Sequence, residues 1–497
     1  SEMCIRDRIR ALADENIDLI FGYPGGAALH IYDAIYKQNK VQHILVRHEQ
    51  AAVHAADGYA RATGKPGVAL VTSGPGATNA ITGIATAYMD SIPVVVISGQ
   101  VASHLIGSDA FQETDMMGIS RPIVKHSFLV QSAEEIPVVI KKAFHIATSG
   151  RPGPVVIDVP KNMTDPNYKF EYKYPKDLVM RSFPILGKGD DEKIAAAIEL
   201  FRSSKKPVIY SGGGTIQADA SKELTEFSKL IGCPVTNTLM GLGAFPGNDD
   251  QFIGMLGMHG TYEANMAMHD CDVMVCIGAR FDDRVTGRTD AFSPNSTKIH
   301  IDIDPAEFGK IIQPDVSING DARLVLQELI PHVHKLDSGP WLKSVASWKK
   351  KYPLKYPKRG GLRAQYVLDE LDRLSESRGI ISTDVGQHQM WAAQFCKSSR
   401  ERQWLSSGGA GTMGYGFPAA IGAQLGCPND LVVAVVGDGG FQMTLAELST
   451  AALQRVPIKI LIIDNRYLGM IRQWQELFFD QRLSGCELEG LSLIHIS

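Results

Sequence analysis

Residues 431–440 read Leu-Val-Val-Ala-Val-Val-Gly-Asp-Gly-Gly. The short continuous apolar run 431–436 is typical of a buried parallel strand, and Gly437-Asp438-Gly439 follows it directly. A second apolar run, 458–463, ends in Asp464-Asn465. Because the carboxyl ends of neighbouring parallel strands meet at one edge of a sheet, we expect Asp438 and Asn465 to lie close together.

These strand ends carry the groups that a phosphate-bound magnesium ion needs. One carboxylate, one amide oxygen and a nearby backbone carbonyl leave positions open for diphosphate oxygens and water around octahedral Mg2+. Gly439 and Gly440 let backbone N–H groups approach phosphate at a helix N-terminus. Taken singly, an Asp-Gly turn and an Asn turn are usually only turns. Together, each at the end of a strand, they favour a magnesium diphosphate site.

Similar apolar runs alternate with helical stretches through the rest of the chain, in three blocks. The predicted strands are 41–46, 67–72, 92–98 and 155–159, then 207–210, 234–237, 273–277 and 298–303, and finally 379–383, 431–436 and 458–463. Helices are predicted over 50–62 and from the turn 73–76 to Asp90, and linkers over 170–190 and 350–361. The pattern predicts an α/β protein of three doubly wound parallel-sheet domains, over residues 1–170, 185–345 and 360–497.

Composition agrees with this size and excludes several classes. The 497 residues, 44% hydrophobic and 21% charged, are those of a globular protein of about three domains. A net charge of −4 does not indicate the excess of basic residues that binds nucleic acid or an anionic membrane. No apolar run is long enough to span a membrane, and no signal peptide is visible. The seven scattered cysteines contain no Cys-x-x-Cys pair, so we expect reduced thiols and a cytoplasmic location, with neither a disulfide framework nor a zinc site.

Gly437-Asp438-Gly439 with Asn465 resembles the signature of thiamine-diphosphate enzymes, and other segments are similar to the acetohydroxyacid (acetolactate) synthase family. These segments are Phe-Gly-Tyr-Pro-Gly-Gly at 21–26, Arg-His-Glu-Gln at 47–50, Thr-Ser-Gly-Pro-Gly-Ala-Thr-Asn at 72–79, Gly-Arg-Pro-Gly-Pro at 150–154, Gly-Met-His-Gly at 257–260, Ala-Arg-Phe-Asp-Asp-Arg at 279–284 and Gly-Met-Ile-Arg-Gln-Trp-Gln at 469–475. The likeness extends from residue 10 to residue 482. Asp464 departs from it, because the family usually has Asn there.

Glu49 is the catalytic residue that the resemblance implies. A carboxyl group at the start of a helix is usually only a favourable charge on the helix dipole. In the family, the corresponding Glu hydrogen-bonds the pyrimidine N1′ of the coenzyme. A carboxyl group removed from water has a raised pKa and can share a proton with a ring nitrogen. The nucleophile is then the coenzyme's own ylid, so no Ser, Cys or Lys nucleophile is required.

The resemblance also implies three cofactors and their binding residues. Thiamine diphosphate is expected to contact Gly26, Asn79, Val385, Gly386, Gln387, His388, Gly411, Met413, Gly437, Gly439, Gly440 and Met470. Magnesium is assigned to Asp438, Asn465 and Tyr467. FAD, which has no net redox role in the family, is assigned to Arg151, Gly212, Gly213, His259, Gly260, Arg280 and Asp302. A glycine run such as 212–214 is by itself more often a turn than a dinucleotide site.

Substrate residues follow from the same comparison. Arg284 offers a planar charged fork for a 2-oxoacid carboxylate, although a surface pair with Asp282 or Asp283 is the simpler interpretation. Trp474 lies where the family selects 2-oxobutanoate over pyruvate by packing on the extra methyl group, a preference worth about 1–3 kcal/mol. Phe111, Gln112, Lys161, Met258 and Met470 are expected to line the same channel.

The resemblance therefore predicts a transferase that decarboxylates pyruvate and joins the two-carbon unit to a second 2-oxoacid, pyruvate or 2-oxobutanoate, in branched-chain amino-acid synthesis. First-block residues are expected to face the third block of a second subunit, in a homodimer or homotetramer that can carry a small regulatory subunit. A flavin-containing pyruvate oxidase is the nearest alternative, and glyoxylate carboligases lack a Glu where Glu49 stands. An inactive cofactor-binding fragment is a further alternative, because family chains continue well beyond this C-terminus. Residues 1–8 and 483–497 lose the pattern and are expected to be foreign or mistranslated sequence.

Overall fold

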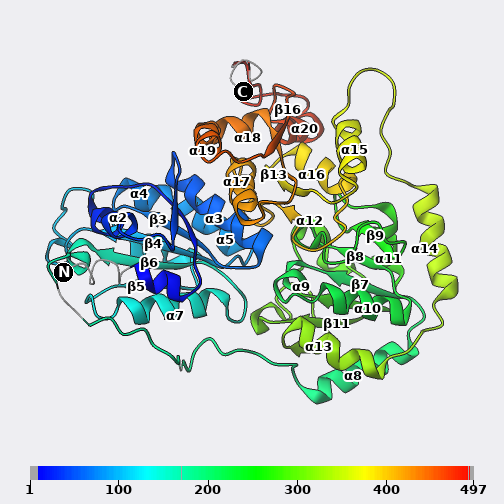
Figure 1. The fold of residues 1–497 in the computed structure, drawn as a ribbon. Helices are drawn as coiled ribbons and strands as arrows, with labels where there is room; N and C mark the ends of the chain where they lie inside the picture. Colours follow the sequence, from blue (N-terminus) through cyan, green and yellow to red (C-terminus); the bar gives the residue numbers. More distant parts are fainter. Residues whose placement is uncertain (1–8, 169–170, 179, 491, 493–497) are drawn as a thin grey trace. The chain divides into compact units, whose positions relative to one another are not determined.

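Three parallel sheets with helices on their faces make up the computed structural model, which describes residues 9–168, 171–178, 180–490 and 492 (Figure 1). Residues 1–8, 491 and 493–497, which belong to the two terminal segments expected to be foreign, lie outside the described residues. By contacts the chain divides into two compact units, residues 1–184, 381–386 and 405–497, and residues 185–380 and 387–404. The predicted fold class, three parallel-sheet α/β domains, is confirmed. The domain boundaries remain a prediction.

The first sheet has the order β2-β1-β3-β4-β6-β5. Its strands are β1 (Leu19–Gly22), β2 (Gln42–Leu45), β3 (Gly67–Val71), β4 (Val94–Gln100), β5 (His126–Leu129) and β6 (Val155–Pro160), and its helices are α2 (Leu29–Tyr36), α3 (Glu49–Thr63), α4 (Pro75–Asn79), α5 (Ile81–Met89), α6 (Met116–Ser120) and α7 (Ile136–Thr148). Every residue of β3, β4 and β6 is buried, because helices cover both faces of the sheet. The helix predicted from the turn 73–76 to Asp90 is divided into α4 and α5 at Ala80, which keeps helical dihedral angles but donates its N–H to Ala77, three residues back.

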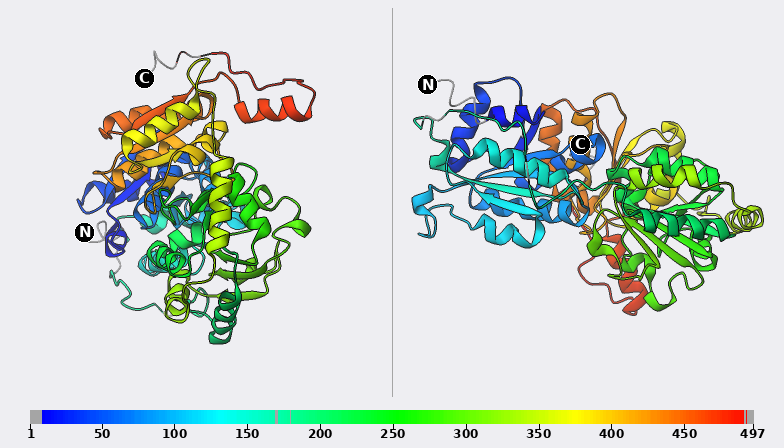
Figure 2. Two further views of the ribbon diagram at one scale, coloured as in Figure 1. Left: turned by 90° about the vertical axis from the view of Figure 1, so that its right-hand side faces the viewer. Right: turned by 90° about the horizontal axis from the view of Figure 1, so that it is seen from below.

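The second sheet has the order β12-β11-β10-β7-β8-β9. Its strands are β7 (Pro207–Ser211), β8 (Val235–Asn237), β9 (Phe252–Met255), β10 (Val273–Ile277), β11 (Thr297–Asp302) and β12 (Val316–Asn319), and its helices are α8 (Asp191–Ser203), α9 (Gly213–Gln217), α10 (Ser221–Ile231), α11 (Tyr262–Asp270), α12 (Asp283–Thr286), α13 (Ala322–Leu329) and α14 (Gly339–Lys351). The chain order reverses between β10 and β7, and the carboxyl ends of strands at such a switch point are where α/β sheets bind ligands. Figure 2 shows the helical layers of this sheet from two further directions.

The third sheet is smaller, with the order β14-β13-β15-β16. Its strands are β13 (Ile380–Thr383), β14 (Trp404–Leu405), β15 (Val432–Gly437) and β16 (Lys459–Ile463), and its helices are α15 (Ala364–Ser375), α16 (Gln387–Phe395), α17 (Gly416–Gly426), α18 (Asp438–Met443), α19 (Leu448–Leu453) and α20 (Gly469–Phe478). β15 and β16 are parallel neighbours, with Gly437 opposite Ile463. Their carboxyl ends therefore meet at one edge, as the two motifs predict.

Helix α3 of the first sheet packs closely against α17 of the third, inside one compact unit. A Cβ added to Gly58 would lie 2.1 Å from the carbonyl oxygen of Ala419. One added to Gly422 would lie 1.8 Å from that of Ala55. Only glycine permits so short a separation of the two helices, so these positions fix how the first domain lies against the third.

Candidate functional site

Glu49 is the first residue of α3 and is largely buried, with 8% of its surface exposed. The preceding His48 is extended and caps the helix, because its Nδ1 accepts the N–H of Gln50 at 3.1 Å. Asn79, at the end of α4, donates its side-chain amide to a Glu49 oxygen at 2.9 Å. Two of the predicted coenzyme residues, 30 positions apart, are thus in direct contact.

Glycines near this carboxylate leave a narrow space beside it. A Cβ on Gly76 would lie 3.3 Å from Glu49 Oε1 and 2.7 Å from the Thr72 methyl, and one on Gly25 would lie 2.4 Å from the same methyl. At the next residue, Gly26, a Cβ would meet nothing within 4 Å. The buried hydroxyl of Thr72 has no hydrogen-bond partner among the described residues. A ring nitrogen or amine entering beside Gly26 would find a carboxylate and a hydroxyl in this region.

The predicted substrate loop lies next to the same turn. A Cβ on Gly74, which has a φ of 59°, would lie 2.8 Å from the carbonyl oxygen of Gln112. Phe111 is almost fully exposed. Lys161 is exposed, at the start of a short 3-10 helix (Lys161–Thr164).

Asp438 is the first residue of α18, and its carboxyl group reaches the end of the neighbouring strand. It accepts hydrogen bonds from backbone N–H groups that include those of Gly439 and Asn465. Burial and the nearby charge of Asp464 raise the pKa of Asp438. The Asn465 amide oxygen accepts the N–H of Tyr467 at 3.0 Å, so the proposed metal ligands form one continuous loop edge. Among the described residues, no group of three or more His, Cys, Asp or Glu side chains is placed to hold a metal ion.

Asp384, which the sequence analysis missed, joins the segments of the predicted diphosphate site. It follows β13, is fully buried, and accepts the backbone N–H groups of Val385 at 2.8 Å and Gly414 at 2.9 Å. A Cβ on Gly440 would lie 2.4 Å from its Oδ1. Burial raises the pKa of Asp384 to about 6, against these hydrogen bonds. Asp384 could have been found from the sequence, because it directly follows the predicted strand 379–383.

Met413 and Gly411 lie in the loop that Asp384 holds. The Met413 methyl would be 3.5 Å from a Cβ on Gly439, and a Cβ on Gly411 would be 4.0 Å from a Val385 methyl. Gly411 has a φ of 64°, which favours glycine. The structure therefore brings Gly411, Met413 and Gly439 into one region.

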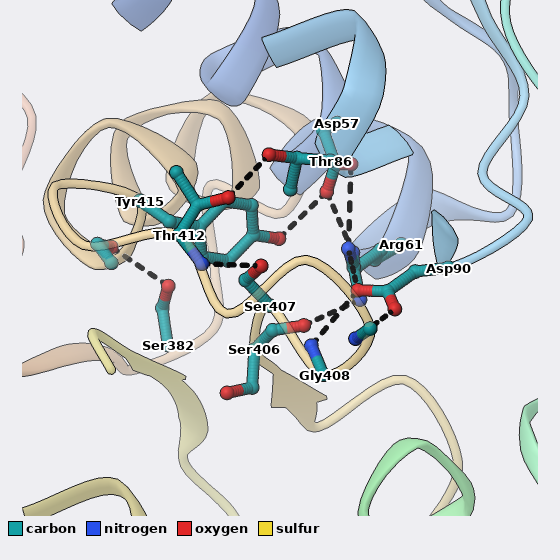
Figure 3. A network of polar contacts seen from close by, with 12 residues as sticks. Asp57, Arg61, Thr86, Asp90, Ser382, Ser406, Ser407, Gly408, Thr412 and Tyr415 are labelled. Atoms are coloured by element: carbon teal, nitrogen blue, oxygen red, sulfur yellow. Dashed lines mark hydrogen bonds and ion pairs between the residues drawn. The ribbon is translucent and has the colours of Figure 1, made fainter. Parts of the chain in front are cut away.

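Buried polar residues connect this loop to the first domain (Figure 3). Arg61 of α3 donates to Asp57 at 2.6 Å, to Asp90 at 2.9 Å and to the carbonyl oxygen of Ser406 at 2.7 Å. Tyr415 donates to Asp57 at 2.6 Å. Burial alone would lower the pKa of Arg61, but the neighbouring Asp57, Tyr415 and Asp90 outweigh it and raise it. The guanidinium therefore stays charged and holds the loop that leads to Gly411.

Asp90 and Thr86 hold the same loop from α5. Asp90 accepts the backbone N–H groups of Gly408 at 3.0 Å and Gly409 at 2.7 Å, and Thr86 shares a hydrogen bond of 2.6 Å with Thr412 (Figure 3). None of these residues was predicted, because their importance depends on a contact between two domains.

The predicted flavin residues of the second sheet gather at its switch point. Gly212 and Gly214 pack on Gly278, where an added Cβ would lie 2.4 Å and 2.7 Å from its backbone, whereas a Cβ on Gly213 would meet nothing nearer than 3.4 Å. At the end of the next strand, both amide atoms of Asn237 are buried without a partner among the described residues. An open glycine and an unsatisfied amide beside it fit the diphosphate and polar groups of a dinucleotide.

Other predicted residues of this unit lie at the ends of neighbouring strands. Arg280 follows β10, and Asp302 ends β11, where it accepts the N–H of Asp304 at 2.8 Å. The carbonyl oxygen of His259 accepts from Gln394 at 2.9 Å, and His259 and Gly260 line a small cavity with residues of α16. Burial and the charge of Arg284 lower the pKa of His259.

Two predicted substrate residues of the second unit are adjacent. The N–H of Met258 donates to the carbonyl oxygen of Arg284 at 2.9 Å. The Arg284 side chain is 59% exposed, and its Nε lies 4.0 Å from an Asp283 oxygen. That separation is the outer limit of an ion pair, so the pairing with Asp283 is weak.

The remaining predicted residues are found in separate places. Trp474 and Met470 lie on α20, where the Trp474 ring is 5.4 Å from the Phe478 ring. Arg151 belongs to the first unit, where its Nε donates to Ser91 at 2.8 Å. Val385 and Gly386 end a segment of the first unit, while Gln387 and His388 begin α16 in the second. Residues 486–488, in the segment expected to be foreign, form a bridge with Tyr467.

Comparisons with known proteins identify the class of the chain. The chain matches family models described as thiamine pyrophosphate enzyme, N-terminal TPP binding domain over residues 7–119, central domain over 194–329 and C-terminal TPP binding domain over 384–496. The fold and the site therefore define an enzyme that depends on thiamine pyrophosphate, which is thiamine diphosphate.

Comparison with individual relatives identifies the family within this class of enzymes. The chain is 53% identical over 490 residues to the acetolactate synthase large subunit of Buchnera aphidicola subsp. Schizaphis graminum, covering 97% of this chain and 86% of the relative. It is 50% identical over 491 residues to the acetolactate synthase isozyme 3 large subunit of Escherichia coli K12, with the same coverage. It is 47% identical over 489 residues to the large subunit of Corynebacterium glutamicum, covering 78% of that protein. The chain belongs to the family of acetolactate synthase large subunits.

Proposed function

We propose that the chain catalyses the acetolactate synthase reaction of branched-chain amino-acid synthesis. Pyruvate loses carbon dioxide, and the remaining two-carbon unit forms a carbon–carbon bond to the keto carbon of a second 2-oxoacid. Pyruvate as acceptor gives 2-acetolactate, and 2-oxobutanoate gives 2-aceto-2-hydroxybutanoate. The identity of 47–53% to acetolactate synthases along 97% of the chain carries this proposal.

Glu49 is the proposed catalytic residue. Bound thiamine diphosphate supplies the nucleophilic carbon and takes up the electrons that decarboxylation releases. Glu49 would hold a proton at the pyrimidine ring of the coenzyme, and Asn79 would fix the direction of its carboxylate. Burial of Glu49 and the narrow, glycine-lined space around it support this role.

Two further cofactors are proposed at separate sites. Asp438, Asn465 and the carbonyl oxygen of Tyr467 would hold Mg2+, which would bind the coenzyme's diphosphate next to Gly439 and Gly440. FAD would bind at the switch point of the second sheet, beside Gly213. The open space at Gly213 and the unsatisfied Asn237 amide support a dinucleotide there.

Substrate selection is assigned to Arg284 and Trp474. The exposed guanidinium of Arg284 offers a bidentate partner for a 2-oxoacid carboxylate. Trp474, 38% exposed on α20, offers an apolar surface for the extra methyl group of 2-oxobutanoate. Phe111, Gln112, Lys161, Met258 and Met470 are proposed to line the channel.

Assembly and location are also proposals. We infer a homodimer or homotetramer with active sites at the subunit interface, and the names of the relatives as large subunits support a small regulatory partner. Within the part of the chain that the structure describes, no helix is long and apolar enough to cross a membrane. The six described cysteines are all free, which supports a cytoplasmic location.

Product analysis tests the proposal. Purified protein is incubated with pyruvate while thiamine diphosphate, Mg2+ and FAD are added or omitted one at a time. Acetolactate that depends on thiamine diphosphate and Mg2+ is expected. Oxygen consumption with acetyl phosphate as product would instead indicate a pyruvate oxidase. Binding of the cofactors without any product would indicate an inactive cofactor-binding chain.

A further inference from the structure

Glu447 is a buried carboxyl group of the third domain that lies against the turn leading to Glu49. It ends a short 3-10 helix (Leu445–Glu447) and is 1% exposed. Its Oε1 accepts the backbone N–H of Arg47 at 2.9 Å, and the N–H of His48 also donates to the carboxylate. Its other oxygen accepts the hydroxyl of Thr450 at 2.7 Å. The buried carboxylate therefore has donors at both oxygens.

The next residues of this segment strengthen the contact. Ser449 Oγ accepts Nε of Arg47 at 2.9 Å, and the hydroxyl of Thr450 also lies 3.4 Å from the carbonyl oxygen of Leu45. Leu45 is the last residue of β2, and Glu49 is the first of α3. The segment 447–450 thus contacts both ends of the turn between that strand and that helix.

The first residue of the turn, Val46, is held by its own sheet, because its N–H donates to the carbonyl oxygen of Gly22 at 3.2 Å. His48, between the turn and α3, is extended with a φ of −152° and a ψ of 142°. Its side chain bonds inside α3, to Gln50, and so does not fix the helix against the strand. Asn79 holds the Glu49 carboxylate at its far end. Glu447 holds the backbone of His48 and Arg47, one and two residues before Glu49.

We propose that Glu447 is a positioning residue that fixes the backbone of Arg47 and His48 and thereby aims the Glu49 carboxylate. The inference rests on the proposed role of Glu49 in the acetolactate synthase reaction. It adds a coupling between domains, because the third domain, which carries the proposed magnesium site, would set the geometry of the catalytic carboxylate in the first. A displacement of about 1 Å in such a group is enough to cost on the order of 100-fold in rate.

Three variants distinguish positioning from general stability. Glu447→Gln keeps an oxygen that accepts from Arg47, and its amide can donate to Thr450. Glu447→Ala removes all these contacts. Ser449→Ala is the matched control, since it removes a contact to the Arg47 side chain and leaves the backbone contacts intact.

The first measurement uses the full chain without coenzyme. Deuterium uptake by the backbone amides of residues 44–50 is followed by mass spectrometry. We expect faster uptake in Glu447→Ala, and uptake like that of the unmodified chain in Glu447→Gln and Ser449→Ala. The second measurement follows exchange of the C2 proton of bound thiamine diphosphate, which we expect to fall on the order of 10- to 100-fold in Glu447→Ala only.

Unchanged uptake over 44–50 together with unchanged C2 exchange in Glu447→Ala would overturn the proposal, as would an equal loss in Ser449→Ala. If Glu447→Ala does not fold, Glu447→Asp replaces it, because the shorter side chain keeps the charge and withdraws the carboxylate from the N–H groups of Arg47 and His48. Normal uptake and normal C2 exchange in Glu447→Asp would then overturn the proposal. Normal C2 exchange in the unmodified chain without acetolactate would contradict the proposed function and leave this inference standing.

Discussion

The side-chain amide of Asn79 donates to the carboxylate of Glu49 at 2.9 Å, from the end of α4 to the beginning of α3. The two helices follow β2 and β3, which lie on either side of β1 in the first sheet, so this hydrogen bond joins two strand-to-helix turns across β1. It occupies one oxygen of the carboxylate. The other lies 3.3 Å from where a Gly76 side chain would begin, so only glycine at position 76 leaves space beside it.

Glu49→Gln is expected to fold and bind thiamine diphosphate, because the side chain keeps its size. Loss of its proton-transfer function should slow C2 proton exchange and acetolactate formation by about 100- to 10,000-fold. Exchange is measured by NMR on the bound coenzyme. Glu134→Gln, which changes an exposed carboxyl group in the same domain, should have no effect. Near-normal exchange in Glu49→Gln would rule out the assignment.

Asn79→Ala removes the donor and leaves Glu49 free to rotate. A hydrogen bond to a charged group is worth about 1.5–3 kcal/mol, so C2 exchange should fall about 10- to 100-fold, less than in Glu49→Gln. The matched amide control is Asn162→Ala, since the Asn162 side chain pairs with the exposed Ser103. A loss in Asn79→Ala no greater than in this control would mean that Asn79 does not orient Glu49.

Trp474→Leu should lose preference for 2-oxobutanoate while pyruvate decarboxylation continues. Packing of one methyl group is worth about 1–3 kcal/mol, so the ratio of the two products should change about 5- to 100-fold when both acceptors compete. Leu477→Ala, on the same helix and 65% exposed, is the control. An unchanged product ratio would show that Trp474 does not select the acceptor and only packs beside Phe478.

Arg61→Met is expected to lower the free energy of unfolding by about 3–5 kcal/mol, because it leaves Asp57 and Asp90 buried without their cation. Urea denaturation followed by fluorescence measures this. Arg202→Met, which breaks an exposed pair with Glu199, should change stability by less than about 1 kcal/mol. Equal effects of the two substitutions would contradict the importance of the buried ion pairs.

Asp158 makes stability depend on pH. It is 1% exposed and accepts from Ser98 and Gln100 at 3.0 Å each, and burial raises its pKa to about 7. Between its pKa in the unfolded chain, about 4, and its folded pKa, the folded state holds a proton that the unfolded state has lost. Its contribution to stability is therefore fully present below pH 4 and is lost as the pH rises towards 7.

The slope is at most about 1.4 kcal/mol per pH unit for one proton. Asp158→Asn should remove this part of the pH dependence between pH 5 and 7 in urea denaturation. Glu134→Gln should retain it. A variant with the same slope as the unmodified chain would show that Asp158 is ionised over the whole range.

Much of the fold followed from local patterns. The strands predicted at 67–72 and 273–277 are β3 and β10, because buried parallel strands are uninterrupted apolar runs. The strand β5, whose residues are polar or half exposed, was not predicted, and neither was the short buried strand β1. The break between α4 and α5 was also missed, because no Gly or Pro marks Ala80 as a turn.

By itself the sequence determined the three alternating blocks and the chemistry at the strand ends: Glu49 before a helix, and Asp438 and Asn465 at neighbouring strands. These features are local, because a strand, its turn and the next helix are formed by consecutive residues. Only the tertiary structure decided that Arg61 lies between Asp57 and Asp90, that Asp384 joins Val385 to Gly414, and that Glu447 meets Arg47, 400 positions away. Of these contacts, the one between Glu447 and Arg47 joins the third domain to the first, and the same two domains meet where Gly58 and Gly422 let α3 and α17 approach closely. Such a pairing depends on the complementary surfaces of two helices far apart in the chain, which no local pattern of either helix specifies.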